Sequence, residues 1–183
     1  ARIAAALRGL DRALPEKIIF SCLNGGLGKQ GHAPVMAEIA KHREVWSIPW
    51  LEGDGSLLHL QPRVSLMFDQ VAAAHQDRLA GVLGIHWRTE EIKTNLRALA
   101  RAATDPKHIP SLPDFYREEC EAQYGSTAAA ELAPCLTEMD RQQWLAGLPS
   151  PEFFPYDPGW GRLAPALEAR LRGAIEMIDR LEA

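Results

Sequence analysis

An apolar run ends abruptly in three side chains that could bind a ligand. Residues 81–85 are followed by His86, Trp87 and Arg88. A short apolar run is typical of a buried parallel strand, and parallel α/β proteins bind ligands beyond the carboxyl ends of their strands. Trp87 offers a ring face for stacking, Arg88 a planar fork for a carboxylate or a hydroxyl pair, and His86 a hydrogen-bond partner. The alternative is a core-capping tryptophan beside a satisfied histidine and an arginine paired with a following glutamate.

A second candidate group follows the apolar residues 45–49. Trp50 and Glu52 come directly after them, and Asp54 and His59 lie in the same loop. Paired carboxylates can supply the acid and base of glycosidic bond cleavage when their separation suits the reaction. Glu52 and Asp54 are therefore candidates for catalysis, with substrate contact or a solvated loop as the alternatives. We expect Trp50 and His59 to contact substrate.

The third candidate is the Gly-rich loop 24–31. Glycines between a strand and a helix can cradle phosphate. However, Gln30 stands where the Walker pattern requires Ser or Thr, and the acidic ribose partner of the dinucleotide pattern is not evident. Residues 23–28 resemble the Gly-rich loop of nucleotide-sugar pyrophosphorylases. An ordinary flexible loop is favoured, with Asn24 as a candidate substrate contact at its start.

The elements that position these groups alternate along the first hundred residues. The spacing of apolar and breaker residues predicts strands at 17–23, 44–49 and 79–86, separated and flanked by helices at 2–14, from 34, at 62–77 and from 89. This alternation predicts adjacent parallel strands joined by helical crossovers. Since parallel strands end on one face, the candidates should converge on one mouth: Asn24, Trp50, Glu52, His86, Trp87 and Arg88.

The composition excludes several classes of protein. The chain has 183 residues and a net charge of -4, which gives no general attraction to nucleic acid or to anionic membranes. No apolar run reaches the roughly 20 residues that span a bilayer. The three cysteines lack close metal-ligand spacing, and His86 has no His or Cys partner at ligand spacing, so we predict free thiols, no metal and no cofactor.

Two features predict a piece of a longer protein. The chain begins inside an amphipathic helix, without an initiator methionine or a signal peptide. Three parallel strands also leave a raw, apolar sheet edge, which proteins normally cover. The compartment is therefore not assigned.

Three motifs, taken together, resemble the last part of a glycoside hydrolase (β/α)8 barrel. They are residues 48–54, 61–64 and 84–89. The continuation, at residues 95–106 and 111–116, is similar to the helical region that follows the barrel in α-glucuronidase-like enzymes.

The resemblance implies an α/β fold in which residues 1–104 form about three strands of a (β/α)8 catalytic barrel and residues 105–183 a helical region. It implies a glycan or oligosaccharide substrate and, as partner, the remainder of the chain's own barrel, with no role for nucleic acid or membrane. The acid–base carboxylates of such barrels commonly lie on middle strands, so we expect them upstream and the chain alone to be inactive. A nucleotide-sugar-binding enzyme using loop 24–31 and a non-catalytic interaction module are the alternatives.

Overall fold

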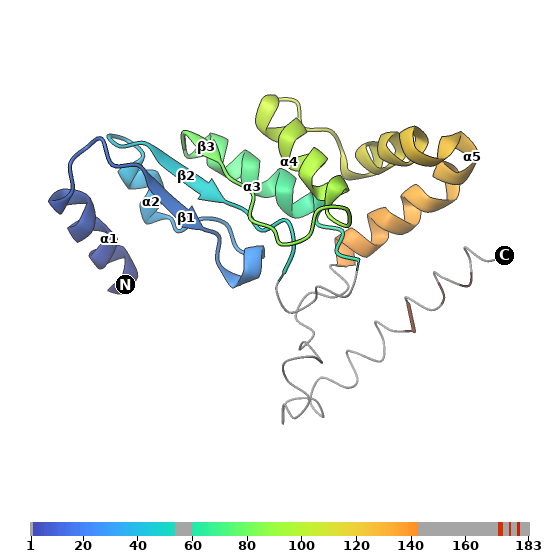
Figure 1. Cartoon of the computed structure of the whole chain (residues 1–183), viewed down its shortest axis with the longest axis horizontal. Helices are drawn as coiled ribbons and strands as arrows, with labels where there is room; N and C mark the ends of the chain where they lie inside the picture. The colour runs from blue at the N-terminus through green and yellow to red at the C-terminus, as the bar shows by residue number, and fades with distance from the viewer. Residues whose placement is uncertain (1, 54–59, 143–171, 174–175, 177–178, 180–183) are drawn as a thin grey trace, which may run out of the picture. The chain divides into compact units, whose positions relative to one another are not determined.

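Three parallel strands alternate with helices in the computed structural model, which describes residues 2–53, 60–142, 172, 173, 176 and 179 (Figure 1). The mixed α/β class with three parallel strands is confirmed. In chain order the elements are α1 (Arg2–Ala13), β1 (Phe20–Leu23), the short 3-10 helix η1 (Gly26–Gly28), α2 (Val35–Ile39), β2 (Val45–Ile48), α3 (Val64–Gln76), β3 (Gly81–Val82), α4 (Lys93–Thr104) and α5 (Leu112–Gln142).

The sheet has the predicted order β1-β2-β3, with parallel pairing throughout. Each strand is shorter than predicted. β1 begins only at Phe20, because the Ile18 N–H donates to Pro15 O in a turn. β3 covers two residues, although Ile85 still donates its N–H to Pro49 O and pairs with Trp50 through an isolated parallel bridge.

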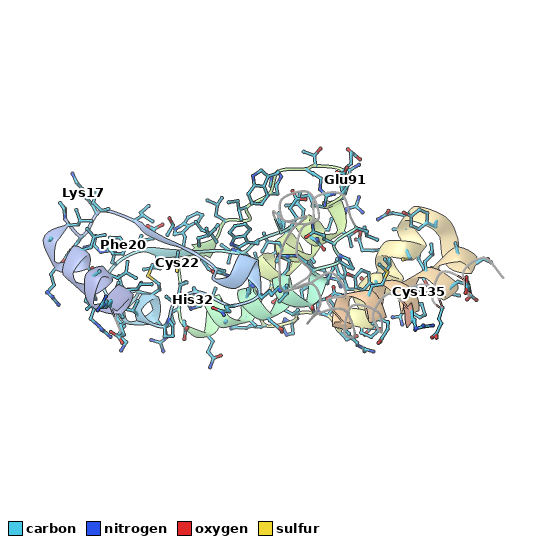
Figure 2. All side chains as sticks on the ribbon, turned by 90° about the horizontal axis from the view of Figure 1, so that it is seen from below. Lys17, Phe20, Cys22, His32, Glu91 and Cys135 are labelled. Atoms are coloured by element: carbon cyan, nitrogen blue, oxygen red, sulfur yellow. The ribbon has the colours of Figure 1, made fainter. Side chains whose placement is uncertain are left out.

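One face of this sheet is covered by helices. Phe20 on β1 and Val45 on β2 form a buried core cluster with Val35, Met36 and Ile39 from α2. Figure 2 labels Phe20 and Cys22 on β1 among the side chains of this part of the chain. α3 contacts β2, β3 and α4, so the helices follow one another along the same side of the sheet (Figure 1).

The opposite face of the sheet is apolar and largely open. Side chains alternate between the two faces of a strand, so Ile19, Leu23 and Leu83 point away from the helix-covered core. They are 53%, 48% and 55% exposed, respectively. A parallel sheet is normally buried on both faces, which makes this exposed apolar face unusual.

A buried arginine holds the end of α1 against the sheet. The Arg43 guanidinium donates to the Asp11 carboxylate and to four backbone carbonyls around the end of α1, those of Asp11, Leu14, Pro15 and Ile18. Its carbon also lies 4.7 Å from the centre of the Phe20 ring. Helix ends leave carbonyls without partners in the helix, and Arg43 bonds one of these, Asp11 O, together with three carbonyls of the segment that follows α1.

The chain divides into two compact units, one containing residues 1–54 and 63–109 and the other residues 55–62 and 110–183.

In the second unit, α5 is interrupted at Gly125, where φ is 82°, so two helical arms meet at a kink. The Tyr116 hydroxyl donates to buried Asp140 across the arms. A proline in the interior of a helix predicts a bend or break, and Pro134 lies inside the second arm. The sequence predicts an irregular loop at residues 149–161, which are rich in proline, glycine and aromatics, and a helix at residues 163–181. The loop and most of the helix lie outside the described residues.

Candidate functional site

Glu52 joins the ends of β2 and β3. Its side chain is fully buried, and Oε1 accepts hydrogen bonds from the backbone N–H groups of Trp87 and Arg88, each at 2.6 Å. Oε2 accepts a third from Arg88 Nε, also at 2.6 Å. These partners explain the burial of a carboxylate, since a buried charge must be paired and hydrogen-bonded.

The same contacts keep Glu52 ionised. Burial by itself raises the pKa of the Glu52 carboxyl, but the hydrogen bonds from Arg88 and Trp87 outweigh burial, so the pKa lies below its usual value. A general acid in glycosidic cleavage needs a raised pKa and access to the substrate. Glu52 has neither, so it is placed as an anchor for the loop after β3 and not as a proton donor or substrate contact.

Trp87 lies on Trp50. The ring centroids are 5.5 Å apart and the planes are inclined at 38°, a tilted contact within the range of favourable aromatic pairs. Trp50 is 7% exposed, whereas Trp87 is 48% exposed. We call the exposed surface of Trp87, supported by Trp50, the Trp87 platform. The two indoles predicted at one mouth are therefore in contact, with one of them open to a ligand.

The Gly-rich loop packs closely against Trp50. At Gly28, φ is 80°, and an added Cβ would lie 2.5 Å from the Trp50 Cβ. The Trp50 indole N–H donates to Asn24 O at 2.9 Å. Glycine at position 28 is therefore required by both the backbone conformation and the close approach of Trp50.

Asn24 lies beneath the surface. It is 2% exposed, its amide N–H donates to Gln70 Oε1 on α3, and its Oδ1 accepts from the Ser47 hydroxyl on β2. Gln70 in turn donates to Gly28 O. The predicted substrate contact is thus part of a buried polar network on the helix-covered side, which ties β1, β2, α3 and the Gly-rich loop together.

His86 and Arg88 complete the turn after β3. The exposed His86 ring hydrogen-bonds through Nδ1 to Arg88 O at 2.9 Å. A carbonyl only accepts, so Nδ1 carries the proton and, in the neutral ring, Nε2 is an acceptor. The Arg88 side chain is 18% exposed and its Nε is committed to Glu52. Asp54 and His59, the other predicted site residues, lie outside the described residues.

Loop 24–31 is folded on itself. The N–H groups of Gly28, Lys29 and Gln30 donate to the carbonyls of Gly25 and Gly26 within the loop. A phosphate cradle requires loop N–H groups that point outward at the anion. Three of these groups are therefore already used, which weighs against the nucleotide-sugar alternative.

Sequence reasoning missed the residues that support the site. Gln70 and Asn95 are buried amides inside helical patterns, and Asn95 donates to Leu51 O while accepting from the Arg63 N–H. In the sequence, each appears only as one polar residue within a helical pattern. The sequence alone does not distinguish such a buried amide from one exposed to solvent. Asn95 fixes the loop after β2 to the starts of α3 and α4.

Within the described parts of the chain, no group of three or more His, Cys, Asp or Glu residues is arranged to hold a metal ion. The helices described there include none with the length and apolarity needed to cross a membrane.

Comparisons with known proteins assign no family to the chain. No protein-family model matches it, and no curated protein matches it significantly. The site described above must therefore be interpreted from its own geometry.

Proposed function

We propose that this chain forms one wall of the sugar-binding pocket of a carbohydrate-active enzyme that hydrolyses glycosidic bonds. The observation that carries the proposal is the half-exposed Trp87 supported by buried Trp50, at the carboxyl ends of parallel strands. An indole combines an apolar face, which suits the apolar face of a pyranose, with low conformational freedom. Glu52 supports the proposal because it fixes the backbone that presents Trp87.

The exposed apolar face of the sheet supports the proposal that this chain is part of a larger barrel. The helices lie along one side of a sheet whose strands follow in chain order, which is the arrangement within a (β/α)8 barrel. The exposed side chains of Ile19, Leu23 and Leu83 would then point into the barrel interior. Further parallel strands, paired with the free edges of β1 and β3, would cover this face and remove both edges.

Catalysis in this proposal comes from carboxylates outside the described wall. Glu52 is buried and its pKa is lowered, so it does not supply the acid. The chain contributes binding and orientation, and the reacting pair belongs to strands that complete the barrel. Isolated, the chain should bind sugars weakly and hydrolyse none.

The experiment is isothermal titration calorimetry of the chain with neutral oligosaccharides such as cellobiose, maltose and xylobiose. One wall of a pocket should bind at least one of them with a dissociation constant on the order of 1 mM. Trp87→Ala should abolish this heat, and Trp46→Ala should retain it, because Trp46 lies on β2 with its indole N–H bonded to Glu44. Equal binding by wild type and Trp87→Ala, or no binding to any of the sugars, would contradict the proposal.

A second candidate function, a non-catalytic interaction module, is favoured by the same open sheet face. In that case the chain should associate with itself or with a partner through this face and ignore sugars. Sedimentation of wild type and Leu83→Lys separates the two. Self-association that Leu83→Lys abolishes, in a chain without sugar binding, would favour the module.

A further inference from the structure

We infer that the Trp87 platform selects an uncharged sugar ring over a uronate, because the cation beside it is already neutralised. This inference rests on the proposed function and names the substrate class of the same site. Arg88 follows Trp87 directly and, as a planar fork, would be the natural partner of a sugar carboxylate. In the structure its Nε is 2.6 Å from Glu52 Oε2.

The ion pair leaves little positive charge for a ligand. Glu52 is fully buried and the Arg88 side chain is 18% exposed, so water screens the pair weakly. A uronate that approached Arg88 would compete with a carboxylate held by three hydrogen bonds, and would be repelled by it. Arg88 therefore stabilises the contact between the loops after β2 and β3 and does not recognise an anionic ligand.

The charged residues that follow Arg88 in the same loop also disfavour a uronate. Glu90 and Glu91 are both exposed, and Glu90 is paired with Lys93. Glu91, labelled in Figure 2, lies in the loop between β3 and α4. Lys93 offsets the charge of Glu90, as Glu52 offsets that of Arg88. The exposed carboxylate of Glu91 would therefore repel an anion that approaches this loop.

His86 adds an acceptor that suits a hydroxyl. Its Nδ1 donates to Arg88 O, so Nε2 of the neutral ring accepts. A sugar hydroxyl can donate to this nitrogen, whereas a carboxylate cannot. The platform thus presents an apolar face and a hydrogen-bond acceptor, both of which match a neutral pyranose.

The test is calorimetric titration of the chain with two forms of one oligosaccharide, one ending in glucose and the other in glucuronate. We expect the neutral form to bind roughly tenfold more tightly. Glu52→Gln, which leaves the Arg88 charge uncompensated, should reduce or reverse this preference. The double variant Glu52→Gln/Arg88→Gln, which removes both charges, should restore it, and circular dichroism melts identify the folded variants.

Lys29 provides the matched control and a test that is independent of the folding of Glu52 variants. Lys29 is exposed and follows Gly28, which contacts Trp50. Lys29→Gln in the wild-type background should leave the preference for the neutral sugar unchanged. Tighter binding of the uronate by wild type, lost in Arg88→Gln or in Lys29→Gln, would overturn the inference while upholding the sugar site. Binding of neither sugar would contradict the proposed function itself.

Discussion

The indole rings of Trp50 and Trp87 lie 5.5 Å apart, one buried and the other half exposed. They come from loops that follow different strands, β2 and β3. Parallel strands end on a common face, and the buried Glu52 carboxylate fixes the Trp87 backbone there. The pair therefore depends on the strand order and on one anchoring side chain.

The two tryptophans should differ in their contribution to stability. Trp50→Ala removes a buried ring and should lower the free energy of unfolding by roughly 3–5 kcal/mol. Trp87→Ala should cost clearly less, because about half of that side chain remains in water. Urea denaturation of both variants measures the difference. A larger loss for Trp87→Ala would mean that Trp87 is a core residue and not a platform.

Glu52 should contribute to the loss of folding stability at acidic pH. Its folded pKa is below the ordinary value of 4.5, so its contribution to stability is complete above that pH and is lost as the pH falls through the folded pKa. At neutral pH, Glu52→Gln should lower the free energy of unfolding by roughly 2 kcal/mol, because hydrogen bonds to a charged group are lost. Its stability should then fall less steeply below pH 4.5 than that of wild type.

Glu90→Gln is the matched control for this prediction, since Glu90 is an exposed glutamate in the loop after β3, the loop whose backbone Glu52 holds. Its unfolding free energy should stay within about 0.5 kcal/mol of wild type at neutral pH. If the free energy of unfolding falls equally steeply below pH 4.5 in wild type and in Glu52→Gln, the folded protein does not favour the charged form of Glu52.

Gly28 should tolerate no side chain. Gly28→Ala places a Cβ 2.5 Å from the Trp50 Cβ at a residue with φ of 80°, so Trp50 must move. We expect a changed near-ultraviolet circular dichroism spectrum and a lower melting temperature. Gly31→Ala in the same loop has open space around the new methyl group and should leave both unchanged. Identical spectra for Gly28→Ala and wild type would refute the close packing.

The buried amide network should behave as a coupled unit. Asn24→Ala leaves Ser47 and Gln70 without their shared partner and should cost roughly 1–3 kcal/mol. In a double-mutant cycle with Gln70→Ala, the double variant should lose less stability than the sum of the two single losses, because both substitutions remove the same hydrogen bond. Strict additivity would indicate that the two amides do not interact.

The strand order and the meeting of Trp50 with Trp87 could be predicted from the sequence, because both follow from apolar runs and a topological rule. The roles of Asn24 and Glu52 could not. Polar residues at strand ends occur both as ligands and as buried supports, and their partners, Gln70 and the backbone of residues 87 and 88, are distant in sequence. The observed strands are shorter than their apolar patterns predict; in β1, the turn Pro15–Ile18 lies within the apolar segment and precedes the first paired residue.

The kink in α5 illustrates the same limit. The sequence predicts that a helix ends at Gly125, because glycine readily adopts a positive φ. Gly125 does interrupt α5 with a positive φ. Pro134 predicts a bend or break in the following helix, yet Gly125 is the residue with non-helical φ and ψ inside α5. Proline lacks one N–H, and the surrounding packing decides whether that loss breaks the helix.

A sugar site at Trp87 is tested most sharply by an NMR titration of the chain, labelled at the indole nitrogens of its five tryptophans, with a neutral oligosaccharide. Trp87→Phe and Trp46→Phe assign two of the signals. We predict that the Trp87 indole signal moves in proportion to bound sugar while the Trp46 signal stays in place. A stationary Trp87 signal at sugar concentrations of about 50 mM, well above the roughly 1 mM dissociation constant expected for one wall of a pocket, would show that Trp87 does not bind sugar.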